Sequence, residues 1–372
     1  MNRNTTTDSQ NSADLSRSVI STWIVLDSPE EETEFPSAGF HSSSKDFQRI
    51  YWRCIVVFFA TSIKQNPDAH HVLFCNRPFE VIPEPESIRL LREWNVELIY
   101  FPLTYRLPKG AVSKFGNVFY ELDILKYAAN QNWPAILVLD NDCVWVKPFS
   151  PVVAQLHDQP LIGYALRPED QKNYQGDVLI NGMSRQRMKA IIEELLGSTR
   201  TGDVNFYGGE FFAATKQGIK TLVSYFDRLW EKTVLESRAV DSIKTEEHFF
   251  TILFEAEGVQ PFAANSYIRR LWTHFADFNV RSSDLNLAIW HVPAEKNFGF
   301  KTLYAEIAHS PSKFFNLSNE KAVQLIRRHM GIPHRSSFKF VRDVSAKIAQ
   351  KLRAKTASLP SRRPAPESAS IS

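Results

Sequence analysis

The chain has 372 residues, a formal net charge of +3, 43% hydrophobic and 23% charged residues, which is the composition of an ordinary soluble globular protein. No segment offers the roughly 20 consecutive apolar residues that a membrane-spanning helix needs, and residues 1–18 lack the apolar region of a secretory signal. The three cysteines share no metal-binding spacing and cannot all pair, which favours a reducing cytoplasm.

The positive charge is concentrated at the C-terminal end of the chain. Eight lysines and arginines and two acidic residues give the segment from Ser336 onward a charge of +6, so the preceding 335 residues carry −3. A basic tail on a weakly acidic body argues against general nucleic-acid binding as the function.

Strands and helices alternate along the first half of the sequence. The apolar patterns predict strands at 19–27, 71–75, 96–101 and 135–139, and helices at 46–64, 85–94 and 113–130. The second half predicts a strand at 160–165, a polar loop at 169–177, a helix at 183–196, an aromatic strand at 202–215, a long helix at 218–236, and a short strand with a loop at 285–300. This alternation is typical of β-α-β units, so we expect an α/β fold with a doubly wound, mostly parallel sheet.

The most informative stretch is the apolar run 135–139, which ends on Asp140-Asn141-Asp142. Open α/β sheets bind ligands at the carboxyl ends of their strands. Two carboxylates this close repel each other unless a cation lies between them, and Mg²⁺ or Mn²⁺ carrying a diphosphate is the usual solution. A solvated turn is the alternative interpretation, because Asp and Asn favour turns.

Four segments in this order resemble the GT-A fold glycosyltransferases, which use nucleotide-sugar donors. They are I-L-V-L-D-N-D (136–142), F-Y-G-G-E-F-F-A-A-T (206–215), T-E-E-H-F-F-T (245–251) and W-H-V-P-A-E-K-N-F-G-F-K (290–301). The segment 206–215 resembles a strand of the blood-group and α-galactosyl transferases, and the segment 290–301 is similar to part of the glycogenin-like transferases. The chain has neither the full blood-group signature nor the H-x-x-G-x-x-K spacing of the glycogenin group.

The resemblance implies a Mn²⁺ or Mg²⁺ ion held by Asp140, Asp142 and His291. It also implies donor-binding residues: Asp140 in the first segment, Lys296 and Lys301 in the fourth, and Lys114, Asn117 and Asp123 in the helix start at 113–123. The alternatives are ordinary ones: a packed histidine, solvated loop lysines, and an amphipathic helix whose polar residues face water.

The resemblance places the acceptor near Gly208, Gly209 and Trp290. Glycine lets a backbone approach a ligand closely, although a simple β-bulge is the competing explanation.

Three acidic residues, Glu210, Glu246 and Glu247, are candidates for catalysis at the anomeric carbon. One of them could act as a base, which gives inversion, or could attack or shield an oxocarbenium-like centre, which gives retention. The resemblance to α-galactosyl transferases favours Glu247 and retention. The alternative is that Glu246 and Glu247 only complement the helix dipole in a first turn.

The tail has a pattern of its own. Phe340, Val344, Ile348 and Leu352 recur every fourth residue among lysines and arginines. This pattern predicts a basic amphipathic helix that binds an anionic membrane surface, or one that packs its apolar stripe on the body. We therefore expect a cytoplasmic protein that is peripheral at a membrane.

Together these features predict a metal-dependent glycosyltransferase that moves a sugar from a UDP-sugar to a glycan or lipid-linked acceptor. A phosphatase of the haloacid-dehalogenase type and a non-catalytic sugar-binding or scaffold protein are the alternatives. The expected organisation is a disordered N-terminus (1–18), a donor-binding half (19–150), an acceptor-binding and catalytic half (151–310), a basic helical extension (311–358) and a disordered tail (359–372).

Overall fold

The computed structural model describes residues 18–29, 34–35, 40–111, 116–167, 178–274 and 277–357. Most of the two predicted disordered ends and of the polar loop expected at 169–177 lies outside these ranges. All structural statements below concern the described residues.

A six-stranded sheet forms the centre of the protein, in the order β5-β4-β1-β6-β9-β8. Its strands are β5 (Glu97–Tyr100), β4 (His70–Cys75), β1 (Val19–Ile24), β6 (Ala135–Leu139), β9 (Tyr207–Thr215) and β8 (Leu161–Ala165). The first four are parallel, and β9 runs antiparallel to both of its neighbours. The prediction of an α/β fold with a mostly parallel central sheet is confirmed.

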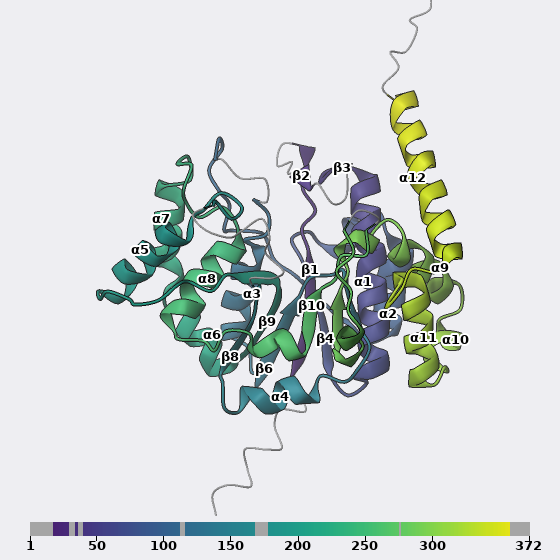
Figure 1. Ribbon diagram of the computed structural model, residues 1–372, viewed down its shortest axis with the longest axis horizontal. Helices are drawn as coiled ribbons and strands as arrows, with labels where there is room; N and C mark the ends of the chain where they lie inside the picture. The colour runs from purple at the N-terminus through teal and green to yellow at the C-terminus, as the bar shows by residue number, and fades with distance from the viewer. Residues whose placement is uncertain are drawn as a thin grey trace, which may run out of the picture.

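Helices lie on both sides of this sheet (Figure 1). On the left of the view are α3 (Tyr120–Ala129), α5 (Arg185–Leu196), α6 (Lys216–Val223), α7 (Phe226–Leu235) and α8 (Glu246–Ala256). On the right are α1 (Lys45–Gln65), α2 (Pro85–Glu93), α9 (Gly299–His309), α10 (Pro311–Phe315), α11 (Asn319–Met330) and α12 (Ser337–Ala357), while α4 (Ser150–Leu156) lies below. A two-stranded pair, β2 (Glu34–Phe35) and β3 (Phe40–His41), lies at the top.

The central strands are buried on both faces, which explains their near-continuous apolar sequence. All five residues of β6 are at most 1% exposed. The two polar residues in the middle of β1 are satisfied inside the sheet, because Ser21 and Thr22 donate hydroxyl hydrogen bonds to the carbonyls of Leu137 and Leu139, each at 2.8 Å. The sheet therefore buries them without leaving a polar group unpaired.

A second, three-stranded sheet joins distant parts of the chain in the order β10-β11-β7. It consists of β10 (Ile268–Arg270), β11 (Ile289–His291) and β7 (Cys143–Trp145), with β11 parallel to β10 and antiparallel to β7. Of these strands only β11 falls within a predicted short strand, at 285–300. The three residues of β7 and of β10 are too few to give a periodic signal.

Two predicted helices differ from the observed ones. The helix expected at 218–236 is divided into α6 and α7, and at the break the Ser224 hydroxyl donates to the carbonyl of Thr221 at 2.6 Å. The helix expected from Ser113 begins only at Tyr120, after turns at 116–119, while residues 112–115 lie outside the described part of the chain. The region 285–300 contains β11 and then the first turn of α9.

Candidate functional site

The register of the small sheet brings the C-terminal segment to the acidic turn. His291 on β11 lies opposite Cys143 on β7, the residue after Asp142. The amide of Val292 donates to the carbonyl of Asp142 at 3.1 Å. Strand pairing therefore places a histidine beside two carboxylates that precede it by about 150 positions in the sequence.

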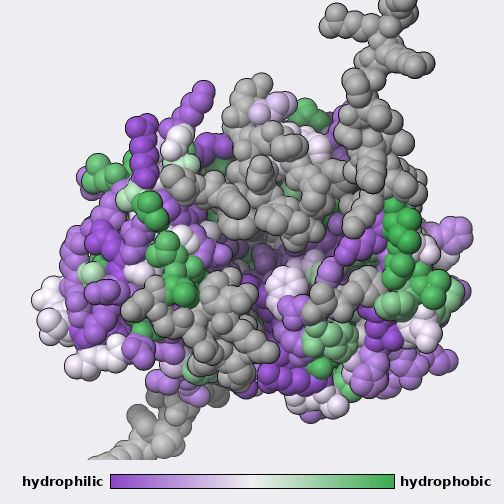
Figure 2. Space-filling model, turned by 45° about the horizontal axis from the view of Figure 1, so that its top comes forward, coloured by the Kyte–Doolittle hydropathy of each residue, from purple (hydrophilic) through white to green (hydrophobic). Residues whose placement is uncertain are grey.

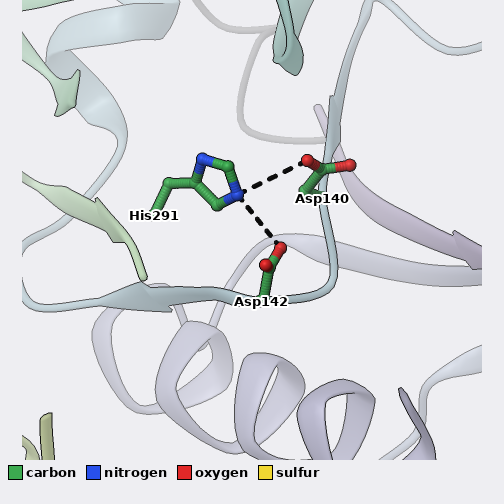
Figure 3. Close-up of side chains that lie close together, drawn as sticks. All are labelled: Asp140, Asp142 and His291. Atoms are coloured by element: carbon green, nitrogen blue, oxygen red, sulfur yellow. Dashed lines mark ion pairs between the residues drawn. The ribbon is translucent and has the colours of Figure 1, made fainter. Parts of the chain in front are cut away.

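Asp140, Asp142 and His291 form a cluster that could hold a metal ion (Figure 3). His291 Nε2 lies 3.2 Å from Asp142 Oδ1 and 3.5 Å from Asp140 Oδ2, and one ligand atom of each residue lies within 4.8 Å of the others. Asp142 and His291 are buried, whereas the Asp140 side chain is 36% exposed and faces the cavity described below.

The imidazole of His291 is oriented by a carboxylate on its other side. Glu210 Oε1 lies 3.3 Å from His291 Nδ1, because the amide of Asp140 donates to the Glu210 carbonyl at 3.3 Å and so brings β9 alongside. A carboxylate partner on Nδ1 directs Nε2 towards a bound ion, which is the usual arrangement around a metal-binding histidine. The residues present therefore fit a divalent cation with oxygen and nitrogen ligands.

Arg270 connects this cluster to the start of α8. It lies opposite His291 in the β10–β11 pair, holds Glu210 with two hydrogen bonds of 2.8 and 2.6 Å, and donates a third to Glu247 at 3.0 Å. Glu247 also accepts a hydrogen bond from Asn181 at 2.7 Å. These bonds hold both carboxylates in place.

The charges around the cluster are strongly coupled. Burial alone would raise the pKa of Asp142, but Lys296, with its Nζ 2.5 Å from Asp142 Oδ2, and His291 hold that pKa well below its ordinary value. Burial and the charge of Asp142 raise the pKa of Asp140. Burial opposes the protonation of His291, yet Asp142 and Glu210 raise its pKa to about 9. Without an ion, the site is thus held together by a protonated lysine and histidine.

A cavity of about 330 Å³ opens beside the cluster. One wall is mainly apolar and comes from β1 and α1, with Trp23, Val25, Phe47 and Tyr51. The opposite wall carries Glu246 and Glu247 at the N-terminus of α8 together with Arg270 and Trp272. Burial, followed by the charges of Glu247 and Asp140, raises the pKa of Glu246 well above its ordinary value.

Several predicted site residues line this cavity, namely Asp140, Asp142, His291, Lys296, Asn117, Glu246 and Glu247. Glu210 is 0% exposed and its carboxylate lies against His291 rather than at the cavity surface. Its predicted catalytic role is replaced by a positioning role, because Arg270 occupies both of its carboxylate oxygens.

Other predicted site residues do not lie at the cavity. Trp290 is 1% exposed in the second hydrophobic cluster, since side chains alternate along β11 and His291 takes the cavity side. Lys301 is exposed on α9, one turn beyond Lys296. Asp123 is 8% exposed and accepts the amide of Thr104 at 2.8 Å. Lys114 lies outside the described residues.

Gly208 and Gly209 are required by the protein's own carboxylates. A Cβ on Gly208 would collide with Glu210 Oε2, and a Cβ on Gly209 would collide with Glu246 Oε1. Both glycines therefore make room for acidic side chains of the site, whereas the sequence suggested contact with an acceptor.

Sequence reasoning missed Arg270, Asn181 and Tyr51. In the sequence, Arg270 is only one of two adjacent arginines near aromatic residues. Asn181 is only the first residue of an Asn-Gly pair, which is typical of a turn. Tyr51 lies on a helix rich in aromatic residues and packs under Lys296, whose Nζ is 5.3 Å from the ring centroid. None of these residues has a local pattern that distinguishes it from a core or surface residue.

His248, the residue after Glu247, predicts an acid sensitivity of the fold. It is 0% exposed, accepts the amide of Lys244 on Nδ1 at 3.0 Å and lies with Nε2 2.7 Å from the carbonyl of Ile180, which defines a neutral ring. Burial lowers the pKa of His248 from 6.5 to about 4. The folded chain therefore binds fewer protons than the unfolded chain over this interval, and stability is lost as the pH falls from 6.5 towards 4, by roughly 3 kcal/mol.

Urea unfolding at pH 7 and pH 4.5 measures this effect. His248→Gln should reduce the stability difference between the two pH values by roughly 2 to 3 kcal/mol, whereas the same change at the exposed His157 should leave it as in the unmodified protein. An unchanged pH dependence in His248→Gln would contradict the assignment of a neutral buried ring.

No family model matches the chain, and no curated protein matches it. Its structure is similar to solved glycosyltransferase structures at low sequence identity. These include the galactosyltransferase LgtC in complex with donor and acceptor sugar analogues (TM-score 0.48, 11% identity, 82% of this chain and 99% of that chain). They also include mouse xyloside xylosyltransferase 1 (0.42, 10%, 74% and 96%) and the bifunctional glycosyltransferase WbbM (0.44, 8%, 74% and 45%). At these values the likeness concerns the fold, and the function is argued from the residues of the cavity.

Proposed function

We propose that this protein is a metal-dependent glycosyltransferase that takes a sugar from a nucleotide-sugar donor, with UDP as the nucleotide. The observation that carries the proposal is the convergence of Asp140, Asp142 and His291 at a cavity whose far wall presents Glu246 and Glu247. A nucleotide sugar needs these features together: a cation site for the diphosphate, an apolar surface for the nucleoside, and carboxylates near the anomeric carbon.

The cavity walls suggest how the donor is oriented. Trp23, Val25, Phe47 and Tyr51 offer an apolar surface to the base. Lys296, at the metal cluster, offers a point charge to the diphosphate. The sugar then extends towards the N-terminus of α8.

Sugar transfer leaves a nucleoside diphosphate that gains negative charge as the glycosidic bond breaks. When bound, Mn²⁺ or Mg²⁺ neutralises this charge as a Lewis acid. In this chain Asp140, Asp142 and His291 would hold the ion, Glu210 would keep His291 in orientation, and Lys296 would contribute a second positive charge.

Among the acidic residues we assign the reacting role to Glu247, with retention of configuration. Arg270 and Asn181 each donate a hydrogen bond to its carboxylate, and these bonds fix the position of a carboxylate that could face an oxocarbenium-like centre. Glu246, which also lines the cavity, can hydrogen-bond to a sugar hydroxyl. The acceptor is a glycan or a lipid-linked saccharide.

The two alternative functions lack a supporting observation among the described residues. Three strands of the central sheet, β1, β4 and β5, precede β6 in the chain, whereas a phosphatase of the haloacid-dehalogenase type carries its nucleophile after the first strand. A scaffold with a decayed site would have lost a metal ligand, but the three residues converge.

Calorimetric titration tests the proposal. The protein is titrated with UDP and with GDP, each with and without Mn²⁺. We expect binding of UDP that is tight only with Mn²⁺, because the cation offsets the repulsion between the diphosphate and the aspartates. Absence of metal-dependent binding of either nucleotide to the folded protein would refute a nucleotide-sugar site, and phosphate esters would then be the next substrates to try.

The C-terminal helix supports a further part of the proposal, association with an anionic membrane. On α12 the residues Phe338, Val341 and Ile348 are 77%, 63% and 55% exposed, while Lys339 and Asp343 are buried. The helix thus turns a polar side to the body and an apolar side outward. Apolar side chains gather at the right of Figure 2, where α12 leaves the body. No helix among the described residues is long and apolar enough to cross a bilayer. The basic residues of α12 suit a cytoplasmic, anionic membrane surface.

Sedimentation with vesicles measures this association. The double variant Phe338→Ser, Val341→Ser should bind vesicles that contain phosphatidylserine at least tenfold more weakly, since two exposed apolar side chains no longer enter the interface. Val240→Ser, at a residue that is 72% exposed outside α12, is the matched control and should bind normally. Equal binding by all three proteins would rule out α12 as the contact.

A further inference from the structure

The C-terminal helix α12 is joined to the body by buried charges. Lys339 and Asp343, one turn apart on the same face, are each 1% exposed. Lys339 Nζ lies 2.8 Å from Asp343 Oδ2 and 2.6 Å from Glu295 Oε2. Arg335, just before the helix, lies 3.2 Å from Asp343 and 3.4 Å from Glu295. With Arg342, which lies 3.4 Å from Asp343, three cations thus face two carboxylates that are at most 1% exposed.

Glu295 is the residue of the body on which these contacts meet. It is 0% exposed and accepts hydrogen bonds from the Thr273 hydroxyl at 2.6 Å and from the amide of Gly299, at the start of α9, at 2.9 Å. Gly299 packs closely against the Glu295 carboxylate, since a Cβ on Gly299 would lie 2.8 Å from Glu295 Oε2. Glu295 therefore joins α12, α9 and the segment after β10.

Glu295 lies between two parts of the cavity wall. The next residue is Lys296, which pairs with Asp142, and His291 lies four residues earlier. Its partner Thr273 follows Trp272, another residue of the wall. A displacement of Glu295 would therefore move the peptide that carries Lys296 and the segment that carries Trp272.

We propose that Lys339 is a positioning residue of the donor site, which acts through Glu295 to hold Lys296 against the metal cluster, so that α12 forms part of the nucleotide-binding site. The identity of the ligand in this inference rests on the proposed function. A buried carboxylate that loses its ammonium partner is drawn towards its remaining cation. For Glu295 that cation is Arg335 at 3.4 Å, and a shift in that direction would move the adjoining peptide that carries Lys296.

The test compares Lys339→Met with Lys321→Met, a matched change at an exposed lysine on α11. Both full-length proteins are titrated with UDP in the presence of Mn²⁺, at a temperature where circular dichroism shows them to be folded. We expect Lys339→Met to weaken binding about tenfold, in the range of other outer-layer residues of metal sites, and Lys321→Met to leave it unchanged. In a Lys296→Met background the additional change Lys339→Met should have no further effect, because the two residues act in series.

Two outcomes would overturn the inference. In the first, Lys339→Met lowers the melting temperature but binds UDP and Mn²⁺ as the unmodified protein does, so that the ion pairs only attach the helix. In the other, the effects of Lys296→Met and Lys339→Met add fully, so that the residues act independently.

The inference can also be tested if the proposed function is wrong. If the unmodified protein binds neither nucleotide, the site is observed directly by nuclear magnetic resonance of the histidine ring nitrogens. The signal of His291 is assigned as the one that is missing in His291→Gln. A shifted His291 signal in Lys339→Met, but not in Lys321→Met, supports the coupling. Identical His291 signals in the two variants would reject it.

Discussion

Replacement of Asp142 by asparagine is expected to lower sugar transfer by about a thousandfold or more, equivalent to about 4 kcal/mol of transition-state stabilisation. Asparagine keeps the shape of the side chain but removes the charge that a divalent cation requires. Asp142 is 1% exposed and also faces Lys296 at 2.5 Å and His291 at 3.2 Å. The assay measures release of UDP from a UDP-sugar, and titration with Mn²⁺ alone measures loss of the ion site.

Asp158→Asn is the control for this variant, because Asp158 is exposed on the connection between α4 and β8. It should retain both activity and Mn²⁺ binding. Metal-dependent turnover that persists in Asp142→Asn would remove Asp142 from the ligands.

The structure adds an effect on stability that the sequence did not indicate. On the sequence alone, we expect a change of Asp142 to abolish turnover without unfolding the chain. In the folded protein the same change removes the carboxylate charge that pairs with the buried Lys296, and it removes one of the three carboxylates around His291. Loss of one partner from a buried pair costs about 3–5 kcal/mol, so melting temperature must be measured beside activity.

Arg270→Met is expected to have the largest effect on stability. Arg270 pairs with Glu210, which is 0% exposed, and with Glu247, whose side chain is 11% exposed. Methionine is an unbranched side chain without charge, so it leaves Glu210 with His291 and Glu247 with Asn181 but removes the guanidinium that both carboxylates share. We expect the free energy of unfolding in urea at pH 7 to fall by about 3–5 kcal/mol, and sugar transfer to be lost because Glu247 is no longer held.

The effect of Arg270→Met should shrink in acid. Burial would raise the pKa of Glu210, but Arg270 and His291 lower it to about 2. The stabilisation that this low pKa represents is present above the unfolded pKa of 4.5 and is lost as the pH falls towards 2. The difference between Arg270→Met and the unmodified protein is therefore expected to be smaller at pH 3.5 than at pH 7.

Arg328→Met provides the comparison, since Arg328 and Glu306 are 65% and 41% exposed. A pair this open to water contributes about 1 kcal/mol or less. If Arg270→Met lowers stability no more than Arg328→Met does, then the buried network is not the element that joins the metal cluster to α8.

The sequence by itself determined the parallel part of the sheet and the position of the acidic turn. The run 135–139 is apolar at every position because β6 is buried on both faces, and such a run followed by two aspartates can be recognised without knowing what surrounds it. The same holds for the basic C-terminal segment, whose four-residue apolar repeat predicts the helix observed as α12.

The outward orientation of Phe340 and Ile348 in that repeat could not be read from its pattern. An amphipathic helix of basic and apolar residues ordinarily packs its apolar side inward. Here Lys339 and Asp343 face inward instead, because Lys339 forms an ion pair with Glu295 of the body and Asp343 forms one with Arg335, just before the helix. Those partners belong to other segments, so only the folded chain shows which side is buried.

The second half of the site was decided by tertiary structure for the same physical reason. His291 reaches the aspartates through the β11–β7 register, and Arg270 reaches Glu210 through the β10–β11 register, between strands of three residues each. Trp290 and His291 are neighbours in sequence, yet one is in the core and the other at the cavity. The pairing partner of a short strand is set by long-range contacts and by which face is buried, and neither is encoded in the local pattern of the residues.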